Sequence, residues 1–377
     1  MALRILHLHS SFDRGGKELR AARLMNAFGR GLEHVVVSAV PGAVAAAAAV
    51  DRGIKVSYPD DFPSLAGKPT PGRLQRLAAA MKPFDLILTY NWGSMDAVMA
   101  HTIFRDFLKL PPLVHHEDGF NEDETDKLKT RRNWYRRLAL GRTSALVVPS
   151  RKLEAVALGA WQQPGGRVRL IPNGIPVAAY AKKPAPDSLP RIVKRPGELW
   201  VGTLAGLRAV KNLPRLVRAF SGLPEEWQLV ILGDGPERDA IKAQAHQSGV
   251  VHRVHLPGFA PDPSKAVGLF DIFALSSDSE QFPISVVEAM AAGLPVASPA
   301  VGDVAAMVSD TNRSLICEPN DDAALAEVLV QLAGDPALRH RIGAANRAHA
   351  LAHYDEKAMI SAYRQVYAQA LGRSAFP

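Results

Sequence analysis

Short apolar runs alternate with helical patterns along most of the chain. In the first half, continuous stretches of Val, Ile and Leu predict parallel strands that are covered on both faces of a sheet. These stretches lie at residues 5–8, 35–40, 86–88, 113–114, 145–148 and 168–171. Helical periodicity between them, for example over residues 18–30 and 126–140, predicts the connecting helices. This alternation indicates a doubly wound α/β unit.

The alternation stops between residues 172 and 196, where six prolines interrupt the periodicity. It resumes with predicted strands at residues 199–204, 229–232, 254–256, 272–275, 295–297 and 315–317. We therefore expect two doubly wound domains in tandem, and a final helix that has no strand after it. That helix could pack on either domain, including by crossing back to the first. The expected division is an N-terminal domain over residues 1–175, a linker over 176–196, a C-terminal domain over 197–354 and a terminal segment over 355–377.

Composition narrows the class of partner. The chain has 45 Lys and Arg against 37 Asp and Glu, so its formal net charge of +8 favours acidic partners such as a nucleoside diphosphate or an anionic lipid surface. Zinc-ligand spacing and interleaved basic and aromatic residues are absent from the sequence, so nucleic acid is not an expected partner. Cys317 is the only cysteine, and no apolar run approaches ~18 residues. These features predict a cytoplasmic protein, with the inner face of the membrane as an alternative location.

The first candidate site is Arg14-Gly15-Gly16-Lys17-Glu18, directly after the first predicted strand. Glycines allow a ligand to approach the backbone, and the N-terminus of the following helix offers free N–H groups to an anion. An ordinary strand–helix turn is the alternative interpretation. The segment is not a P-loop, because the G-K-S/T ending is absent.

The second candidate site is Arg208-x-x-Lys211-Asn212, after the first strand of the second domain. Two cations three residues apart can bind a diphosphate, and Asn212 is suited to cap the next helix. A solvated loop with unrelated basic residues is the alternative. Because ligands of open α/β sheets bind at the carboxyl ends of strands, the position favours a binding role.

The third and strongest candidate is the stretch of residues 278–293. Pro283 is suited to the first turn of a helix, which Gly293 would end. Glu280 would precede this helix and Glu288 would lie inside it, on either side of first-turn amides that can hold a phosphate. Carboxylates accept hydrogen bonds from sugar hydroxyls. Glu288 has apolar neighbours in sequence, so we expect it to have a partner, unless it lies on a solvated face.

Glu280-x7-Glu288, followed by Ala-Met-Ala-Ala-Gly-Leu-Pro, resembles the E-x7-E signature of the retaining glycosyltransferases of family 4. The resemblance covers nearly the whole chain and implies the GT-B fold, with two doubly wound Rossmann-like domains that face each other across a cleft. The N-terminal domain would lie on the acceptor side and the C-terminal domain would bind the donor. Further matching motifs are Gly15-Gly16-x-Glu18, Ile171-Pro172-Asn173-Gly174, Gly202-Thr203-Leu204, Leu232-Gly233-Asp234-Gly235-Pro236 and Leu256-Pro257-Gly258-Phe259.

The resemblance also implies roles for single residues. Arg208 and Lys211 match the pair that neutralises the donor diphosphate, whose charge grows during transfer. Glu280 matches the carboxylate that holds donor-sugar hydroxyls, and Glu288 the one that binds the ribose. The remaining residues of the implied donor site are Gly15 and Gly16 in the N-terminal loop, Gly202, the wall beside the base at Pro257, Gly258 and Phe259, and the phosphate-contacting turn at Phe282, Pro283, Ile284 and Ser285.

Two departures from the family pattern affect the sugar end of this site. The common E-G-F-G turn is replaced by Glu280-Gln281-Phe282-Pro283, which leaves the identity of the donor sugar open. Many relatives also place a histidine before a glycine in a loop of the first domain. Here Asp118 has that position, within His115-His116-Glu117-Asp118-Gly119. Either His116 or Asp118 is expected to supply the polar group at the donor sugar.

The predicted reaction is transfer of a hexosyl unit, with retention, from a nucleoside diphosphate sugar to an acceptor hydroxyl. A UDP- or GDP-sugar is the expected donor, and a glycan or glycolipid in cell-surface glycan or exopolysaccharide synthesis is the expected acceptor. The cationic pair makes a metal unnecessary, and we expect no other cofactor. Alternatives are a sugar-nucleotide epimerase, a phosphorylase, whose pyridoxal phosphate lysine site we do not find, and a non-catalytic nucleotide-sugar binding protein.

A basic cluster between residues 127 and 142 suggests a further partner. It consists of Lys127, Lys129, Arg131, Arg132, Arg136, Arg137 and Arg142, with Trp134, Tyr135 and Leu138 among them. Such a helix can contact an anionic membrane or an acidic acceptor. A core-packed helix with a solvated basic face is the alternative.

Overall fold

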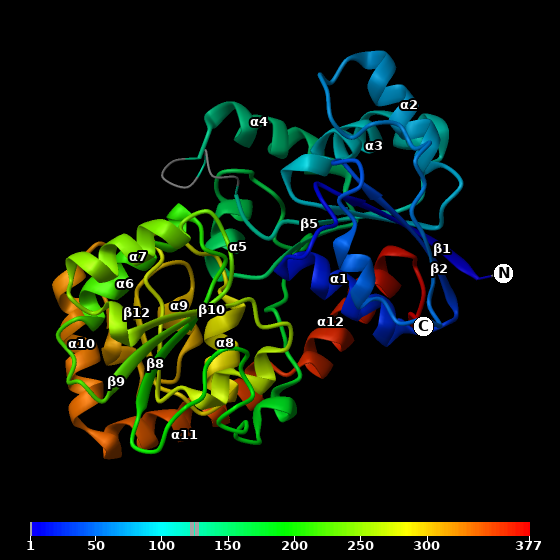
Figure 1. The fold of residues 1–377 in the computed structure, drawn as a ribbon. Coiled ribbons are helices and arrows are strands. Elements are labelled where there is room, and N and C mark those ends of the chain that lie inside the picture. Colours follow the sequence, from blue (N-terminus) through cyan, green and yellow to red (C-terminus); the bar gives the residue numbers. More distant parts are fainter. Residues whose placement is uncertain (1, 121–123, 125–127) are drawn as a thin grey trace. The chain divides into compact units, whose positions relative to one another are not determined.

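The computed structural model describes residues 2–120, 124 and 128–377 (Figure 1). The chain divides into two compact units. Unit 1 consists of Met1–Pro172 and Met359–Pro377, and unit 2 consists of Asn173–Ala358. Each unit is built on a parallel sheet that has helices on both faces, so the predicted doubly wound α/β class is confirmed.

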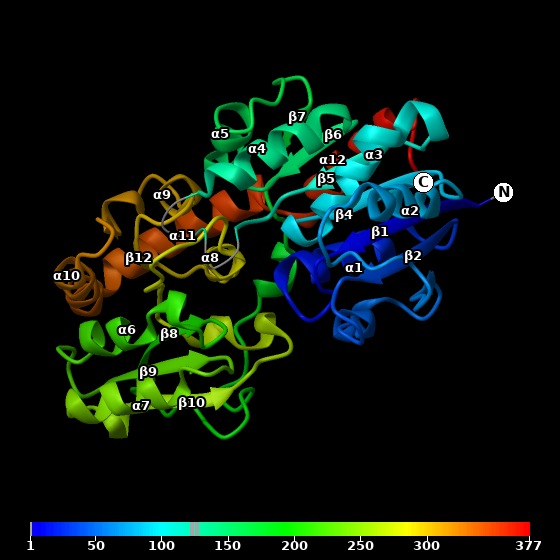
Figure 2. The same ribbon diagram turned by 90° about the horizontal axis from the view of Figure 1, so that it is seen from above.

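The sheet of unit 1 has the strand order β3-β2-β1-β4-β5-β6-β7, and its strand pairs are parallel. Figure 2 shows β2, β1, β4, β5, β6 and β7 in this order across the sheet. The bounds are β1 (Leu3–His9), β2 (Leu32–Ser38), β3 (Lys55–Ser57), β4 (Leu86–Tyr90), β5 (Leu113–His116), β6 (Ala145–Val148) and β7 (Val168–Leu170). The predicted strands are confirmed. β3 was not predicted, because this edge strand is short and largely exposed, without a continuous apolar run.

Helices cover both faces of this sheet. On one face, α1 (Gly16–Phe28) and α12 (Glu356–Ala370) pack into a common core. The other face carries α2 (Pro71–Met81), α3 (Met95–Leu108), α4 (Thr130–Ala139) and α5 (Arg151–Leu158). The helix predicted over residues 126–140 begins only at Thr130, because Lys129 has an extended backbone with ψ of 117°. Asp126 and Lys127 lie outside the described residues.

The final helix, α12, packs on the first of the two units. Tyr363 and Tyr367 of α12 are 0% and 1% exposed in the core of unit 1. The hydroxyl group of Tyr367 lies 2.9 Å from Nε2 of His116, which comes from the end of β5. Of the two positions that the sequence allowed for this helix, the structure shows the one on unit 1.

The sheet of unit 2 has the strand order β10-β9-β8-β11-β12-β13, again with parallel pairs. The strands are β8 (Leu199–Leu204), β9 (Trp227–Leu232), β10 (Val254–Gly258), β11 (Ile272–Ala274), β12 (Val296–Pro299) and β13 (Ile316–Cys317). The helices are α6 (Leu213–Phe220), α7 (Arg238–Gln247), α8 (Ile284–Ala291), α9 (Val304–Met307), α10 (Asp322–Gly334) and α11 (Pro336–His353). Within the described part of the chain, no helix combines the length and the apolar character needed to cross a bilayer.

The segment of residues 176–196, expected to be a linker, is part of unit 2. Val177, Tyr180 and Leu189 are buried in the core of that unit. The Lys194 ammonium lies 2.5 Å from the Asp271 carboxylate, at the start of β11. Buried apolar contacts and an ion pair therefore attach this proline-rich segment to unit 2 along its length.

Candidate functional site

The turn after β8 carries both predicted cations. Arg208 precedes a single 3-10 turn, Ala209–Lys211, and the Lys211 amide donates to the Arg208 carbonyl at 2.9 Å. Asn212 follows in the left-handed region with φ of +42°. Its side chain accepts a hydrogen bond from the Arg215 amide and caps α6, as predicted. Arg208 and Lys211 therefore lie on one turn at the carboxyl end of β8.

The side chains of Lys211 and Glu280 are paired. Nζ of Lys211 lies 2.5 Å from Oε1 of Glu280, and the Ser277 hydroxyl donates to the same carboxylate oxygen at 2.7 Å. The Lys211 and Glu280 side chains are 16% and 11% exposed, so the ion pair is mostly shielded from water. Glu280 follows β11, which is hydrogen-bonded to β8, and the two carboxyl-terminal loops therefore meet.

A set of polar contacts fixes the Lys211 loop against the Glu280 loop. The Ser276 hydroxyl donates to the Lys211 carbonyl at 2.9 Å, and Nδ2 of Asn212 donates to Oδ1 of Asp278 at 3.0 Å. Arg215 of α6 pairs with the same Asp278 oxygen at 2.9 Å. Asp278 begins the predicted donor stretch, whereas Ser276 and Arg215 were not predicted as site residues. The sequence did contain one indication of this contact, because Asn212 and Asp278 each follow a predicted strand and the two strands can be neighbours in a sheet.

The backbone of Gly302 packs closely against the turn that follows Glu280. A Cβ atom at Gly302 would lie 2.6 Å from the Glu280 carbonyl oxygen, and its φ of +59° also disfavours a side chain. The next residue, Asp303, donates its amide to the Gln281 carbonyl at 3.1 Å. The Phe282 ring is buried and packs edge to face on Tyr354, with 5.7 Å between the ring centroids. The turn is therefore fixed by both backbone and side-chain contacts.

Helix α8 begins one residue later than the sequence predicted. Pro283 is the N-cap with ψ of 107°, so it precedes the first turn and does not belong to it. The first helical hydrogen bond runs from the Val286 amide to the Pro283 carbonyl at 3.0 Å, which leaves the amides of Ile284 and Ser285 ahead of it. Gly293, with φ of +77°, ends the helix as predicted.

Glu288 has the partner that its apolar neighbours led us to expect. The Tyr180 hydroxyl donates to Oε1 of Glu288 at 3.0 Å. Tyr180 ends the short 3-10 helix Val177–Tyr180 and is 6% exposed. Tyr180 was not predicted as a site residue, although it is the only tyrosine in the sequence of residues 176–196.

The other predicted donor residues of unit 2 have different environments. Gly202 lies in the middle of β8, where a Cβ atom would be 2.1 Å from the Phe270 ring, so close packing accounts for this glycine. Pro257 is buried at the end of β10, Gly258 has φ of +105°, and Phe259 follows with 51% of its surface exposed. The Phe259 ring is thus available to a ligand at the carboxyl end of β10, whereas Gly202 is part of the core.

In unit 1, Gly15 and Gly16 form the start of α1. Gly15 is its N-cap, and Gly16 is its first residue. Lys17 pairs with the neighbouring Glu18 carboxylate. Burial lowers the pKa of Lys17 to about 8, and the nearby Asp118 carboxylate opposes this lowering only in part. Lys17, at the start of α1, therefore loses its proton at a lower pH than an ordinary lysine does.

His116 and Asp118, the two residues proposed to supply the polar group of unit 1, have different environments in the structure. His116 is 1% exposed, and its ring nitrogens lie 3.1 Å from the Thr89 carbonyl and 2.9 Å from the Tyr367 hydroxyl. Burial lowers the pKa of His116 to about 3. Because both nitrogens are engaged in the core, His116 is poorly placed to bind a ligand.

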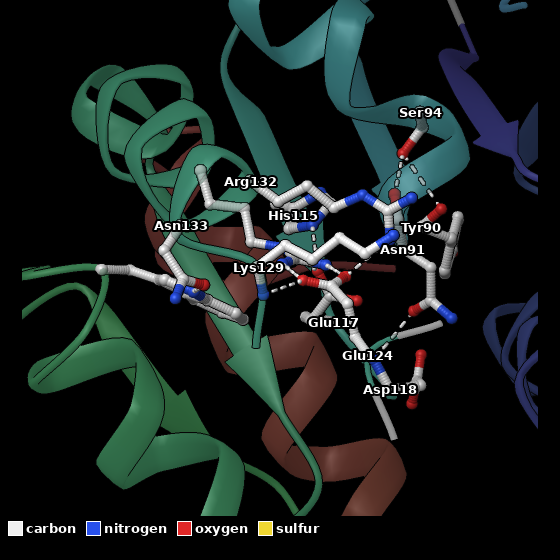
Figure 3. A network of polar contacts seen from close by, with 12 residues as sticks. Tyr90, Asn91, Ser94, His115, Glu117, Asp118, Glu124, Lys129, Arg132 and Asn133 are labelled. Carbon is white, nitrogen blue, oxygen red and sulfur yellow. Dashed lines mark hydrogen bonds and ion pairs between the residues drawn. The ribbon is translucent and has the colours of Figure 1, made fainter. Parts of the chain in front are cut away.

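Asp118 has a side chain that is 12% exposed and paired with the guanidinium of Arg20. Its amide donates to Oδ1 of Asn91 at 2.8 Å, as Figure 3 shows. Burial alone would raise the pKa of Asp118, but the Arg20 guanidinium holds it below its ordinary value. Asp118 is therefore an ionised, positioned side chain at the end of β5.

The predicted basic cluster is partly internal. Arg136 is fully buried, and its guanidinium donates to both carboxylate oxygens of Glu124 at 3.1 and 3.0 Å. Arg132 binds the same Glu124 carboxylate at 2.9 Å, and Figure 3 shows these two side chains together. The buried Glu117 lies 3.6 Å from Arg136. Arg136 therefore belongs to the buried side of α4 and not to a solvated basic face, while Lys127 lies outside the described residues.

A metal site was not expected. In residues 2–120, 124 and 128–377, no group of three or more His, Cys, Asp or Glu side chains is placed to hold a metal ion.

The chain is similar to known proteins in sequence. Residues 14–179 match the family described as Glycosyltransferase Family 4, and residues 187–349 match Glycosyl transferases group 1. D-inositol 3-phosphate glycosyltransferase of Xylanimonas cellulosilytica is 32% identical over 220 residues, which cover 55% of this chain and 52% of that protein. EpsF of Bacillus subtilis, which carries a glycosyltransferase name, is 26% identical over 78% of each chain. The match thus spans about half the length of the first relative.

The fold is also similar to solved structures. Anabaena HepE in complex with UDP has a TM-score of 0.77 at 20% identity, over 97% of this chain and 98% of that chain. HepE has also been solved in complex with UDP-glucose. At this identity the likeness supports the shared two-sheet fold.

Proposed function

The chain belongs to the glycosyltransferases of family 4 and group 1, and we propose that it transfers a hexosyl unit from a nucleoside diphosphate sugar to an acceptor hydroxyl, with retention at the anomeric carbon. The observation that carries this proposal is the Lys211–Glu280 pair, at 2.5 Å, where the loops after β8 and β11 meet. The cation can bind the diphosphate and the carboxylate can bind the sugar, and both lie at the carboxyl ends of neighbouring strands, where such ligands bind.

Lys211 and Arg208 would bind the diphosphate. When the glycosidic bond breaks, negative charge grows on the leaving phosphate oxygens, and cations already in place stabilise that charge without reorganising. The contacts of Asn212 and Arg215 with Asp278 hold the Lys211 loop in position for this role. In this mechanism no metal ion is needed for charge neutralisation, and no other cofactor is involved.

Glu280 would accept hydrogen bonds from donor-sugar hydroxyls. Its carboxylate already receives the Ser277 hydroxyl and the Lys211 ammonium, which fix its orientation. The same fixed geometry would hold the anomeric carbon beside the diphosphate. The leaving diphosphate would then deprotonate the acceptor hydroxyl on the same face, which accounts for retention.

The nucleotide would lie along α8 and the end of β10. Amides of Ile284 and Ser285, in the turn that includes Phe282 and Pro283, would contact phosphate at the helix start. Glu288, fixed by Tyr180, would accept hydrogen bonds from the ribose. We also propose that the base lies beside Pro257, Gly258 and Phe259.

Unit 1 would supply the acceptor side and unit 2 the donor side. Gly15 and Gly16 at the start of α1 would bind an anionic phosphate group, because glycine leaves their backbone amides open. Asp118 would be the polar side chain that replaces the histidine of other family members, and its pairing with Arg20 would orient it. His116 would act only through packing.

A UDP-sugar is the first donor to test, since HepE binds UDP and UDP-glucose, and a GDP-sugar is the second. The proposed acceptor is a glycan or glycolipid of cell-surface or exopolysaccharide synthesis, in the cytoplasm or at the inner membrane face. The anionic polyol in the name of the Xylanimonas relative and the net charge of +8 here favour an acidic acceptor.

The test is a thermal-shift screen with UDP-, GDP-, ADP- and dTDP-sugars, followed by product analysis with the donor that stabilises the protein most. Proton NMR of the product should show the anomeric configuration of the donor. Conversion of the donor sugar without any acceptor would indicate an epimerase. Tight donor binding without turnover across an acceptor panel would indicate a non-catalytic binding protein.

A further inference from the structure

Helices α3 and α4 expose large apolar side chains to solvent. On α3, Ile103 and Phe107 are 55% and 83% exposed, and on α4, Trp134 and Leu138 are 56% and 60% exposed. In each helix the two residues are four positions apart and so lie on one side of it. Among the described residues, Phe107 has the largest exposed fraction of any large hydrophobic side chain. Such a group of exposed apolar residues is typical of an interaction surface.

The two helices lie next to each other on the same face of the unit 1 sheet (Figure 1). The Thr102 hydroxyl of α3 donates to the Ala139 carbonyl of α4 at 2.5 Å. Arg105 of α3 donates to the Arg142 carbonyl, just beyond α4, at 3.0 Å. The buried residues of α3 face the sheet, so the exposed apolar residues of both helices point away from it.

Cations accompany these apolar side chains. Residues 128–142 include no acidic residue, and the exposed Asp106 of α3 is paired with Arg142 at 2.6 Å. Arg131 is exposed on α4, and the Arg137 guanidinium lies 5.0 Å from the centre of the Trp134 ring. Lys109 is exposed at the end of α3. Arg136 and Arg132, by contrast, are committed to Glu124 inside unit 1.

We propose that this face is a docking surface for an anionic lipid bilayer. We call it the α3–α4 face and define it by Ile103, Phe107, Lys109, Arg131, Trp134, Arg137 and Leu138. The basic cluster in the sequence predicted contact with a membrane, and the α3–α4 face is the surface that we propose makes this contact. The apolar side chains of α3 belong to this surface, although the charge pattern did not indicate them. Aromatic and aliphatic side chains enter the interfacial region, while arginines remain at the level of the anionic headgroups.

Charge favours a bilayer over a second copy of the chain. A symmetric dimer through this face would bring each copy of Arg131 and Arg137 towards its equivalents, and like charges at an interface are unfavourable. An anionic leaflet is complementary to the same cations. The Arg137–Trp134 stack presents a cation and an amphipathic ring together, which suits the boundary between headgroups and acyl chains.

The test is vesicle co-sedimentation of the full chain without donor or acceptor, so its outcome is independent of the proposed transfer reaction. Vesicles are phosphatidylcholine alone, or phosphatidylcholine with an equal share of phosphatidylglycerol. We expect binding to the anionic vesicles only. Charge reversal at two sites, Arg131→Glu with Arg137→Glu, should lower that binding roughly tenfold or more. Phe107→Ser with Trp134→Ser should lower it to a similar extent, including at high salt.

Matched controls lie on exposed positions of unit 2. Lys242→Glu with Arg341→Glu makes the same change of net charge, and Leu351→Ser removes an apolar side chain that is 60% exposed. These controls should bind anionic vesicles as the wild type does. Equal binding of the wild type and the Arg131/Arg137 variant would overturn the proposal. So would absence of vesicle binding combined with self-association that the Phe107/Trp134 variant abolishes, which would assign the face to a second copy.

Discussion

The Tyr180 hydroxyl donates a 3.0 Å hydrogen bond to Oε1 of Glu288. A residue of the proline-rich segment thereby orients a carboxylate on α8, which we propose to bind the ribose. Tyr180→Phe removes only this donor. We expect it to weaken UDP binding by about 0.5–1.5 kcal/mol, measured by calorimetry.

Glu288→Gln should weaken UDP binding more than Tyr180→Phe does. It should also abolish the preference of the protein for UDP over its 2′,3′-dideoxy analogue. The control for the tyrosine substitution is Tyr135→Phe in unit 1, whose hydroxyl binds Asp96, and it should leave UDP binding unchanged. If Glu288→Gln keeps the full preference for ribose hydroxyls, the proposed role of Glu288 is wrong.

Lys211→Ala should lower the transfer rate by about two to three orders of magnitude, because the leaving diphosphate loses a cation that is already in place. Binding of UDP should weaken, while binding of uridine should not, since only the former carries the diphosphate. Lys242→Ala, on the exposed side of α7, is the matched control. Wild-type kcat in the Lys211 variant would contradict the mechanism.

Gly302→Ala should destabilise unit 2 and lower activity together. The new Cβ atom would lie 2.6 Å from the Glu280 carbonyl oxygen, so the turn that positions Glu280 must move. We expect a loss of about 1–3 kcal/mol in the free energy of unfolding, measured in urea, with a parallel fall in kcat. Gly334→Ala is the control, because no atom beyond its chain neighbours and its own helix backbone lies within 4 Å of its Cβ position. This change should be neutral or slightly stabilising.

Stability should decrease as the pH falls below about 6.5, because buried histidines stay neutral in the folded state. The folded pKa of His116 is about 3 against an ordinary value of 6.5, so between these values the unfolded chain binds a proton that the folded chain does not. The stability that this difference contributes is present above pH 6.5 and is lost on acidification. Other histidines whose pKa is lowered by burial act in the same direction: His7, His9, His34 and His101.

His116→Gln should therefore make the pH dependence of unfolding free energy shallower by about 1.4 kcal/mol per pH unit in this window. The slope is the measurement, since the variant also loses a buried hydrogen bond at every pH. An unchanged slope in the His116 variant would show that its titration is not linked to folding.

Local patterns predicted most of the fold. Continuous apolar runs identified the central strands because both faces of these parallel sheets are covered. The exposed edge strand β3 lacks such a run and was missed. The start of α4 was placed too early, because helical periodicity continues into Lys129, whose backbone is extended.

The sequence indicated candidate site residues where they belong to a local motif. Glu280 and Glu288 lie eight positions apart, and their spacing identified them. The Tyr180–Glu288 contact joins residues 108 positions apart, and no local pattern encodes it. The burial of Arg136 likewise depends on tertiary contacts, since its guanidinium lies 4.8 and 5.1 Å from the rings of Trp92 and Trp161. Sequence alone identified Arg136 only as a basic residue.

The placement of α12 has a consequence for synthesis of the protein. His116 and its partner Tyr367 are separated by 251 residues, and the whole of unit 2 lies between the two segments of unit 1. A ribosome therefore delivers every strand of unit 2 before the tyrosines that complete the core of unit 1. Although it begins first, unit 1 closes last. Until α12 emerges, the part of this sheet face beside α1 lacks the helix that buries it.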